Sequence, residues 1–208
     1  ERVDFGGFGA SWKGLINGQV DAAFASTNSG LAYEAAASPR GLTWPTIDPD
    51  NAEGLGRMQS IAPFFSVNKA RVGATIDGTD GYQGAGYAYP VLVAMEETEP
   101  DLVYNMTKAM DQLFDEYDGN APGIGGWAID KQNYKWVVPY HDGAIEYFKE
   151  IGTWSDEAQA HNDNLVARQD ALAAAWESLT AENPDDWASA WETKRREALA
   201  AGGFDVVF

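Results

Sequence analysis

The chain has 208 residues, of which 45% are hydrophobic and 22% are charged, as in an ordinary globular protein. Its 32 acidic and 14 basic residues give a net charge of -18, which repels nucleic acid and anionic lipid, so we expect no nucleic-acid partner. The absence of cysteine excludes disulfides, cysteine nucleophiles and iron–sulfur clusters. No apolar run is long enough to cross a bilayer.

The first part of the chain predicts alternating helices and strands. A short helix is expected over 11–18, a buried strand over 20–25 and a helix over 31–38. A small polar turn lies between that strand and the second helix, which leaves free backbone N–H groups at the end of the strand. Residues 39–60 contain three prolines and predict irregular surface or a short insertion in the lobe.

The rest of the chain predicts a second strand and then several helices. The strand is expected over 89–95. Helices are predicted over 99–118 with Thr98 as cap, over 143–151 with Asp142 as cap, from Ser155 to about 181, and from 183 to Gly202. We expect Leu172 and Trp176 to be buried, because a long helix needs an apolar face covered. Strands alternating with helices predict an α/β fold with a mainly parallel sheet.

The residue pattern favours a binding protein over an enzyme. The two histidines, His141 and His161, stand in no metal-binding spacing, so we expect no metal and no cofactor. Neither a G-x-S-x-G nucleophile elbow nor a phosphate-binding loop is present. Two alternatives remain open: an α/β hydrolytic enzyme, and an interaction module built on the Trp-rich C-terminal part.

The polar turn after the predicted first strand is the best candidate for a ligand site. Short hydroxyl and amide side chains, together with a helix N-terminus, suit a carboxylate or another polar group. Aromatic rings beside glycines would supply the walls of the pocket. The residues predicted to bind ligand are Ser26, Thr27, Asn28 and Ser29 in the turn, with Trp12, Tyr82 and Tyr87 as walls. Helix capping by the turn and ordinary packing of the tyrosines are the alternative interpretations.

Four stretches, taken in order, resemble the TAXI family, the extracytoplasmic solute receptors of certain TRAP transporters. They are residues 15–24 (LINGQVDAAF), 81–84 (GYQG) with the expected strand after it, 102–109 (LVYNMTKA) and 139–152 (PYHDGAIEYFKEIG). The last stretch is the most specific. Two departures stand out, because Asp142 replaces a proline of the family motif and Asn28-Ser29-Gly30 replaces a glycine-rich turn that ends in proline.

The resemblance implies a periplasmic-binding-protein-like, two-lobe α/β fold of type II-like topology, with the N-terminal lobe segment absent from this sequence and a C-terminal helical extension. Residues 1–88 would be the remainder of the second lobe, 89–152 the return segment of the first lobe, and 153–208 a helical strap. The implied protein is periplasmic, with its signal peptide removed. It would capture an amino acid such as glutamate, or a small organic acid, and deliver it to the membrane permease subunits. We also expect it to pair with the missing N-terminal segment or chain.

Overall fold

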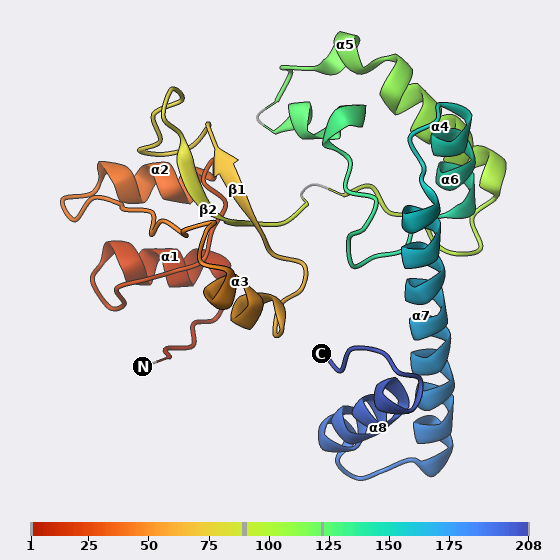
Figure 1. Cartoon of the computed structure of the whole chain (residues 1–208). Helices are drawn as coiled ribbons and strands as arrows, with labels where there is room; N and C mark the ends of the chain where they lie inside the picture. Colours follow the sequence, from red (N-terminus) through yellow and green to blue (C-terminus); the bar gives the residue numbers. More distant parts are fainter. Residues whose placement is uncertain (1, 89–90, 122, 208) are drawn as a thin grey trace. The chain divides into compact units, whose positions relative to one another are not determined.

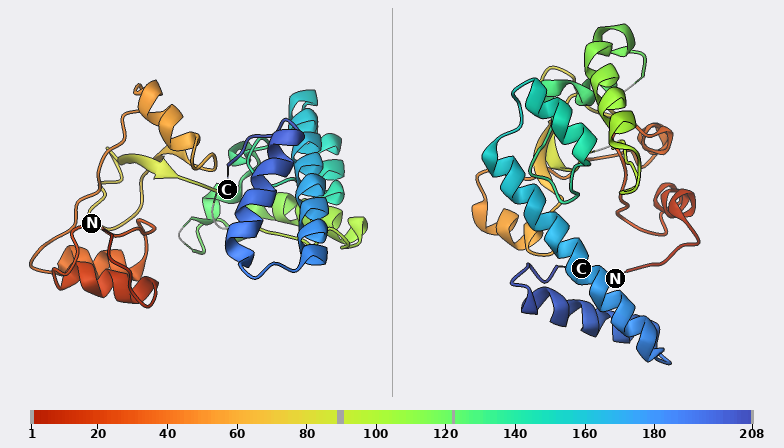
Figure 2. Two further views of the ribbon diagram at one scale, coloured as in Figure 1. Left: turned by 90° about the horizontal axis from the view of Figure 1, so that it is seen from below. Right: turned by 90° about the vertical axis from the view of Figure 1, so that its right-hand side faces the viewer.

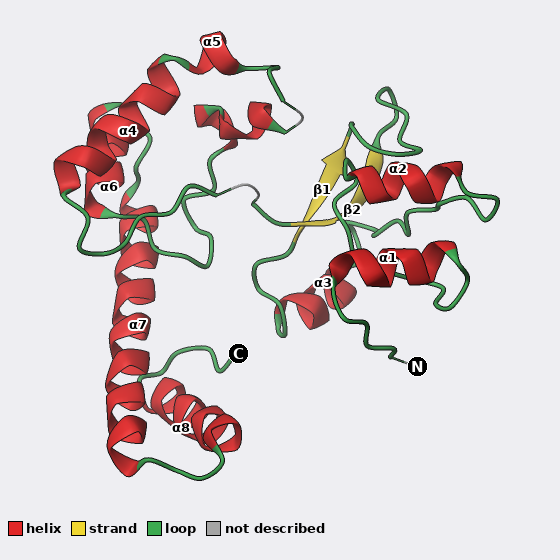
Figure 3. Cartoon of the chain, turned by 180° about the vertical axis from the view of Figure 1, so that it is seen from behind, coloured by secondary structure: helices red, strands yellow, loops and turns green. Residues whose placement is uncertain are grey.

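The computed structural model describes residues 2–88, 91–121 and 123–207, which form two compact units. Unit 1 comprises Glu1–Arg57 and Phe65–Tyr87, and unit 2 comprises Met58–Phe64 and Ala88–Phe208 (Figure 1). Most of the regular secondary structure is helical, and the described residues contain one two-stranded sheet (Figure 3). This mixture of helices and a small sheet is consistent with an α/β fold. The assignment of the units to receptor lobes stays a prediction.

Unit 1 is built from two short helices packed together and a β-hairpin. Its elements are α1 (Phe8–Ile16), α2 (Gly30–Ala37), most of α3 (Ala52–Gln59), β1 (Ser66–Ala70) and β2 (Tyr82–Gly86). Trp12 of α1 is 1% exposed and packs with Ala32 and Ala35 of α2 and with Ala74. Small alanines on α2 let the large indole come close, which explains why two helices of about two turns each can share a core.

The sheet differs from the sequence-based expectation. Strands β1 and β2 pair antiparallel, with Ser66 opposite Gly86 and Ala70 opposite Tyr82, so the predicted parallel sheet is wrong for the described residues. The strand expected over 20–25 is also wrong, because the backbone there joins no ladder. Its carbonyl at Phe24 instead accepts the indole N–H of Trp12. Residues 39–60, expected to be irregular, contain α3.

Unit 2 is mainly helical. Its elements are α4 (Pro100–Gln112), α5 (Phe114–Tyr117), two 3₁₀ turns (Ile124–Trp127 and Ile129–Lys131), α6 (Asp142–Glu150), α7 (Asp156–Glu182) and α8 (Trp187–Ala201). The buried core comprises Ala144, Tyr147 and Phe148 of α6, against which α4 and the loop tyrosines pack. Four rings, those of Tyr134, Tyr140, Phe148 and Trp154, contact one another with centroids 5.0–6.4 Å apart.

The second expected strand is not formed over 91–95. Tyr89 and Pro90, where that strand was predicted to begin, lie outside the described residues. Val93 and Met95 are 81% and 73% exposed, and this stretch pairs with no strand in the part of the chain that the structure describes. An apolar run makes a strand only where another strand supplies the hydrogen bonds.

The predicted helices of unit 2 are present, with small differences at their ends. Ser155 caps α7 as expected, since its hydroxyl oxygen accepts the N–H of Ala158 at 3.1 Å. Glu99 rather than Thr98 occupies the N-cap position of α4. His141 rather than Asp142 caps α6, because the Nδ1 of His141 accepts the N–H of Gly143 at 3.1 Å.

Helices α7 and α8 lie side by side as a helical hairpin (Figures 1 and 2). Near its tip the indole of Trp176 contacts those of Trp187 and Trp191, with centroids 5.8 and 5.2 Å apart. The expectation that Leu172 and Trp176 are buried is wrong, because Leu172 is only half-buried and 46% of Trp176 is exposed. Leu179, 1% exposed, and Leu199, 0% exposed, are the side chains that the hairpin buries instead.

Candidate functional site

The turn over 26–29 begins α2 with a chain of side-chain hydrogen bonds. The Ser29 hydroxyl oxygen accepts the N–H of Ala32 at 3.2 Å and so caps the helix. The Ser26 hydroxyl donates to Oδ1 of Asn28 at 2.6 Å, which fixes the orientation of the carboxamide. In the described part of the chain no group accepts from the Asn28 amide nitrogen, so this nitrogen can donate to a ligand.

A second loop holds this turn in place. The Thr27 hydroxyl donates to the carbonyl of Val72 at 2.9 Å, and the Thr27 carbonyl accepts the N–H of Ala74 at 2.9 Å. Gly73 lies between them with φ +149, and a Cβ there would come within 2.6 Å of the Thr27 carbonyl oxygen. Because Thr27 is committed to this loop, Asn28 is the member of the turn with the most hydrogen-bonding capacity left.

Trp12 and Tyr87 meet the turn through Phe24, a residue that the sequence did not single out. The Trp12 indole N–H donates to the Phe24 carbonyl at 2.9 Å, and the Phe24 ring stacks on Tyr87 with centroids 6.4 Å apart. Phe65 also contacts Tyr87, at 5.8 Å. Phe24 is 61% exposed and Tyr87 is 38% exposed, so they can present ring surface to a ligand, whereas the ring of Trp12 is a core group.

Tyr82 lies next to Trp44, which bonds to the loop that holds the turn. Its ring contacts that of Trp44 with centroids 5.9 Å apart, and its hydroxyl donates to the Pro45 carbonyl at 2.7 Å. The Trp44 indole N–H donates to the carbonyl of Ala74, the residue whose N–H bonds to Thr27. Burial raises the pKa of Tyr82, which keeps its phenol neutral and able to donate.

The structure thus connects the seven predicted residues within unit 1 through a small number of intermediates. Phe24 joins Trp12 and Tyr87 to the turn, and Trp44 joins Tyr82 to it through Ala74. Both aromatic residues were missed because their partners are distant in sequence: Trp44 bonds to a residue thirty positions away and has no local motif. The available chemistry is one amide donor, α2 N–H groups and aromatic surface, which suits a small polar ligand. Binding at this site stays a prediction.

Two stretches that resemble the receptor family form the interface between α4 and α6 in unit 2. The Lys108 ammonium donates to the Tyr104 hydroxyl at 2.9 Å and to Glu150 at 3.1 Å, and the Tyr104 hydroxyl also donates to Glu150. These bonds hold the pKa of the Glu150 carboxyl below its ordinary value. The Tyr147 hydroxyl donates to Asp111 at 2.6 Å. The motif residues of these stretches therefore tie two helices together.

Both histidines are engaged with the backbone. Nδ1 of His141 caps α6, and Nε2 of His161 lies 2.5 Å from the Trp136 carbonyl oxygen, which requires a proton on that nitrogen. Across residues 2–88, 91–121 and 123–207, neither histidine hydrogen-bonds to a serine, aspartate or glutamate side chain. Over the same residues no three of His, Asp and Glu are grouped so as to hold a metal ion.

The sequence matches one known protein family over most of its length. The NMT1-like family matches residues 4–152, which cover the whole of unit 1 except its first residues and extend through α6. The chain belongs to the NMT1-like family. This family is of the periplasmic-binding type and is related to solute receptors, which indicates a general solute-binding role with small-molecule ligands and transporter partners.

Members of the family are generally extracytoplasmic. No helix among the described residues has the length and apolar character needed to span a bilayer. Searches of curated proteins and of solved structures found no match.

Proposed function

We propose that this NMT1-like protein is the extracytoplasmic solute-binding subunit of a TRAP transporter, of the TAXI type. It captures a small polar solute, an amino acid such as glutamate or a small organic acid, and delivers it to the membrane permease. The observation that carries the proposal is the family match over residues 4–152. The four stretches that resemble TAXI receptors all lie within the matched residues and support the finer proposal.

In this proposal the turn of unit 1 contacts the solute. The Asn28 amide nitrogen and the first N–H groups of α2 donate to a carboxylate, which the positive end of a helix favours. Tyr82 and Tyr87 supply aromatic surface beside the turn, and the Trp12 indole N–H holds the backbone at Phe24 through its carbonyl. The overall charge of -18 has little effect on an anionic ligand at the turn, because salt screens charges that lie more than about 8–10 Å away.

Calorimetric titration of the protein with glutamate, and with succinate as a small organic acid, tests the proposal. We expect a saturable heat in the wild type and at least a tenfold loss of affinity in Asn28→Ala. Asn51→Ala is the matched control, because the Asn51 side chain accepts from Gly54 in α3, away from the turn. Full affinity in Asn28→Ala would mean that the turn is not the site, and no heat with any amino or organic acid would overturn the proposed solute class.

We further propose that the protein performs no chemistry on its solute. The bonds of both histidines to the backbone support this, because they leave no Ser–His–acid chain among the described residues. Prolonged incubation with glutamate, followed by NMR of the recovered solute, is expected to return it unchanged. Accumulation of a product with time, lost in His161→Ala or His141→Ala, would favour the hydrolytic alternative.

A further inference from the structure

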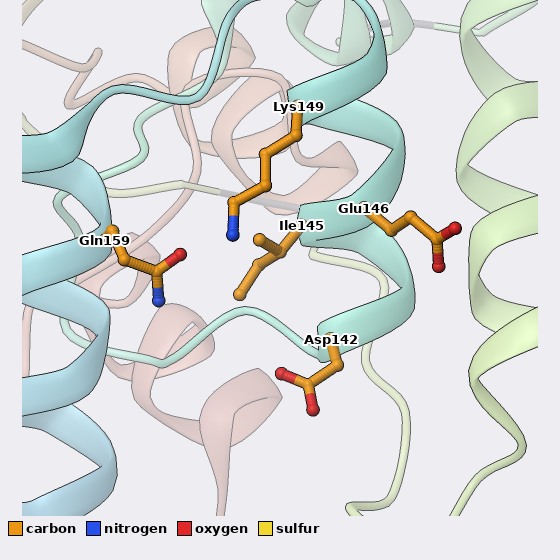
Figure 4. Close-up of a pocket in the computed structure, with 5 residues that line it drawn as sticks. All are labelled: Asp142, Ile145, Glu146, Lys149 and Gln159. Atoms are coloured by element: carbon orange, nitrogen blue, oxygen red, sulfur yellow. The ribbon is translucent and has the colours of Figure 1, made fainter.

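A groove of about 310 Å³ lies between α6 and the beginning of α7 in unit 2, distant in sequence from every residue of the proposed solute site. It is lined by Asp142, Ile145, Glu146, Lys149 and Gln159 (Figure 4). Ile145 is 5% exposed and forms an apolar floor. A volume of this size is at the lower end of the range for small-molecule sites.

Two opposite charges face this groove from the two ends of α6. Asp142 is the first residue of α6 and Lys149 stands in its last turn, so their α-carbons are about 10.5 Å apart along the helix axis. Helical side chains lean towards the N-terminus, which carries the Lys149 ammonium back over Ile145. Figure 4 shows the Asp142 carboxylate and the Lys149 ammonium turned to the same space, while the Glu146 carboxylate points away from it.

Asp142 and Lys149 have no ion-pair partner among the described residues. By contrast, the neighbouring Glu150 on the same helix is paired with Lys108. The groove therefore presents one negative and one positive group on either side of an apolar floor.

The wall opposite α6 is held rigidly. The Gln159 Oε1 accepts the Trp154 indole N–H at 3.0 Å, and the Gln159 Nε2 donates to Asp163 at 2.8 Å. Trp154 is itself fixed by ring contacts with Phe148 and Tyr140. The Gln159 side chain thus limits the width of the groove. The two charges that select the ligand both come from α6.

We infer that this groove binds a small zwitterion of the α-amino acid class. The ligand carboxylate binds the Lys149 ammonium, the ligand ammonium binds the Asp142 carboxylate, and an aliphatic side chain covers Ile145. A ligand with a single charge would satisfy one of the two groups and leave the other without a partner. The site is separate from the proposed solute site, whose residues all lie in unit 1.

Heteronuclear NMR titration of the full chain with three probes of nearly the same shape tests the inference. The probes are L-valine, its amide, which lacks the anionic charge, and 3-methylbutanoate, which lacks the ammonium. We expect L-valine to shift the amide signals of Ile145, Lys149 and Gln159, and each single-charge probe to bind at least tenfold more weakly. Equal responses to the three probes, or no shift at these residues at saturating L-valine, would overturn the inference.

Charge-removing variants separate this site from its surroundings and from the proposed solute site. Lys149→Gln and Asp142→Asn are each expected to weaken L-valine binding at least tenfold. Asp170→Asn, at an exposed position of α7 that does not line the groove, is the control and is expected to keep the wild-type affinity. An equal loss in the control would show a general charge effect and refute the site. Asn28→Ala is expected to leave the groove signals unchanged, so this inference and the proposed function can fail independently.

Discussion

At Gly143 the backbone of α6 packs directly against that of α4, and Gly143→Ala tests how tightly the two helices are joined. A Cβ at this position would lie 2.2 Å from the Pro100 carbonyl oxygen and 2.9 Å from the Tyr104 nitrogen. Both obstacles are backbone atoms, which cannot rotate away as a flexible side chain can. The alanine is therefore accommodated only if α4 and α6 separate by roughly the missing ångström.

The cost of that separation can be estimated from packing. Overfilling a packed interface costs about 1–3 kcal/mol, and we expect the upper value because Tyr147–Asp111 and Lys108–Glu150 bonds resist the movement. Alanine in place of glycine in a helix returns up to about 1 kcal/mol through its higher helix propensity. The net expectation is a loss of about 2 kcal/mol in the free energy of unfolding of unit 2.

Urea denaturation followed by far-ultraviolet circular dichroism and by tryptophan fluorescence measures this loss. The matched control is Gly56→Ala in α3, where an added Cβ meets nothing within 4 Å. The control is expected to be neutral or stabilising by up to about 1 kcal/mol, so only Gly143→Ala should lose stability. A Gly143→Ala protein as stable as the wild type would refute the close approach of α4 and α6.

Three further measurements test the packing of both units. Burial raises the pKa of Tyr147 to about 12, above its ordinary value of 10.0. The stability that its neutral phenol gives unit 2 is therefore complete below pH 10 and lost between pH 10 and 12. When the free energy of unfolding is measured against pH, Tyr147→Phe should show a smaller loss over this range. Ser155→Ala removes the cap of α7 and should cost about 1 kcal/mol in urea denaturation, whereas Ser178→Ala, at an exposed position in the last turns of α7, should cost less than half of that. Trp12 is 1% exposed and Trp176 is 46% exposed. Trp12→Ala should therefore lower the free energy of unfolding by about 3–5 kcal/mol and Trp176→Ala by about 1 kcal/mol. Equal losses would contradict the assigned burial.

Helices with a cap, an apolar period and a glycine stop were predictable from the sequence. The ends of α7 fall within about one residue of the predicted ones, because Ser155 offers a cap and Asn183-Pro184 cannot continue the helix. Short apolar runs were not predictable in the same way. Residues 20–25 have the composition of a buried strand, yet Trp12 takes their carbonyl bond, and α1 and α2 supply their packing. A short apolar run can adopt any conformation that buries its side chains, so its composition alone does not predict a strand.

The candidate site was predictable where local chemistry decides and not where distant residues meet. Ser29 as a cap of α2 follows from its position before an apolar helix. The clamp between Thr27 and Val72 spans 45 positions, and no local pattern indicates it. Trp12 was predicted to be a pocket wall because of its size and stacking ability, but the same size is what makes it the centre of the core of unit 1.

The way α7 is anchored sets where this chain can be shortened. The family match ends at Gly152, but the buried Asn162 accepts the N–H of Tyr140 at 2.7 Å, and His161 bonds to the Trp136 carbonyl. Cutting at the family boundary would strip both partners and leave two backbone groups of the preceding loop without their bonds, each costing about 1–3 kcal/mol if it stays buried. Two further turns of α7, as far as Asn162, are thus an integral part of the folded domain, and the boundary set by packing lies beyond the boundary of the family match at Gly152.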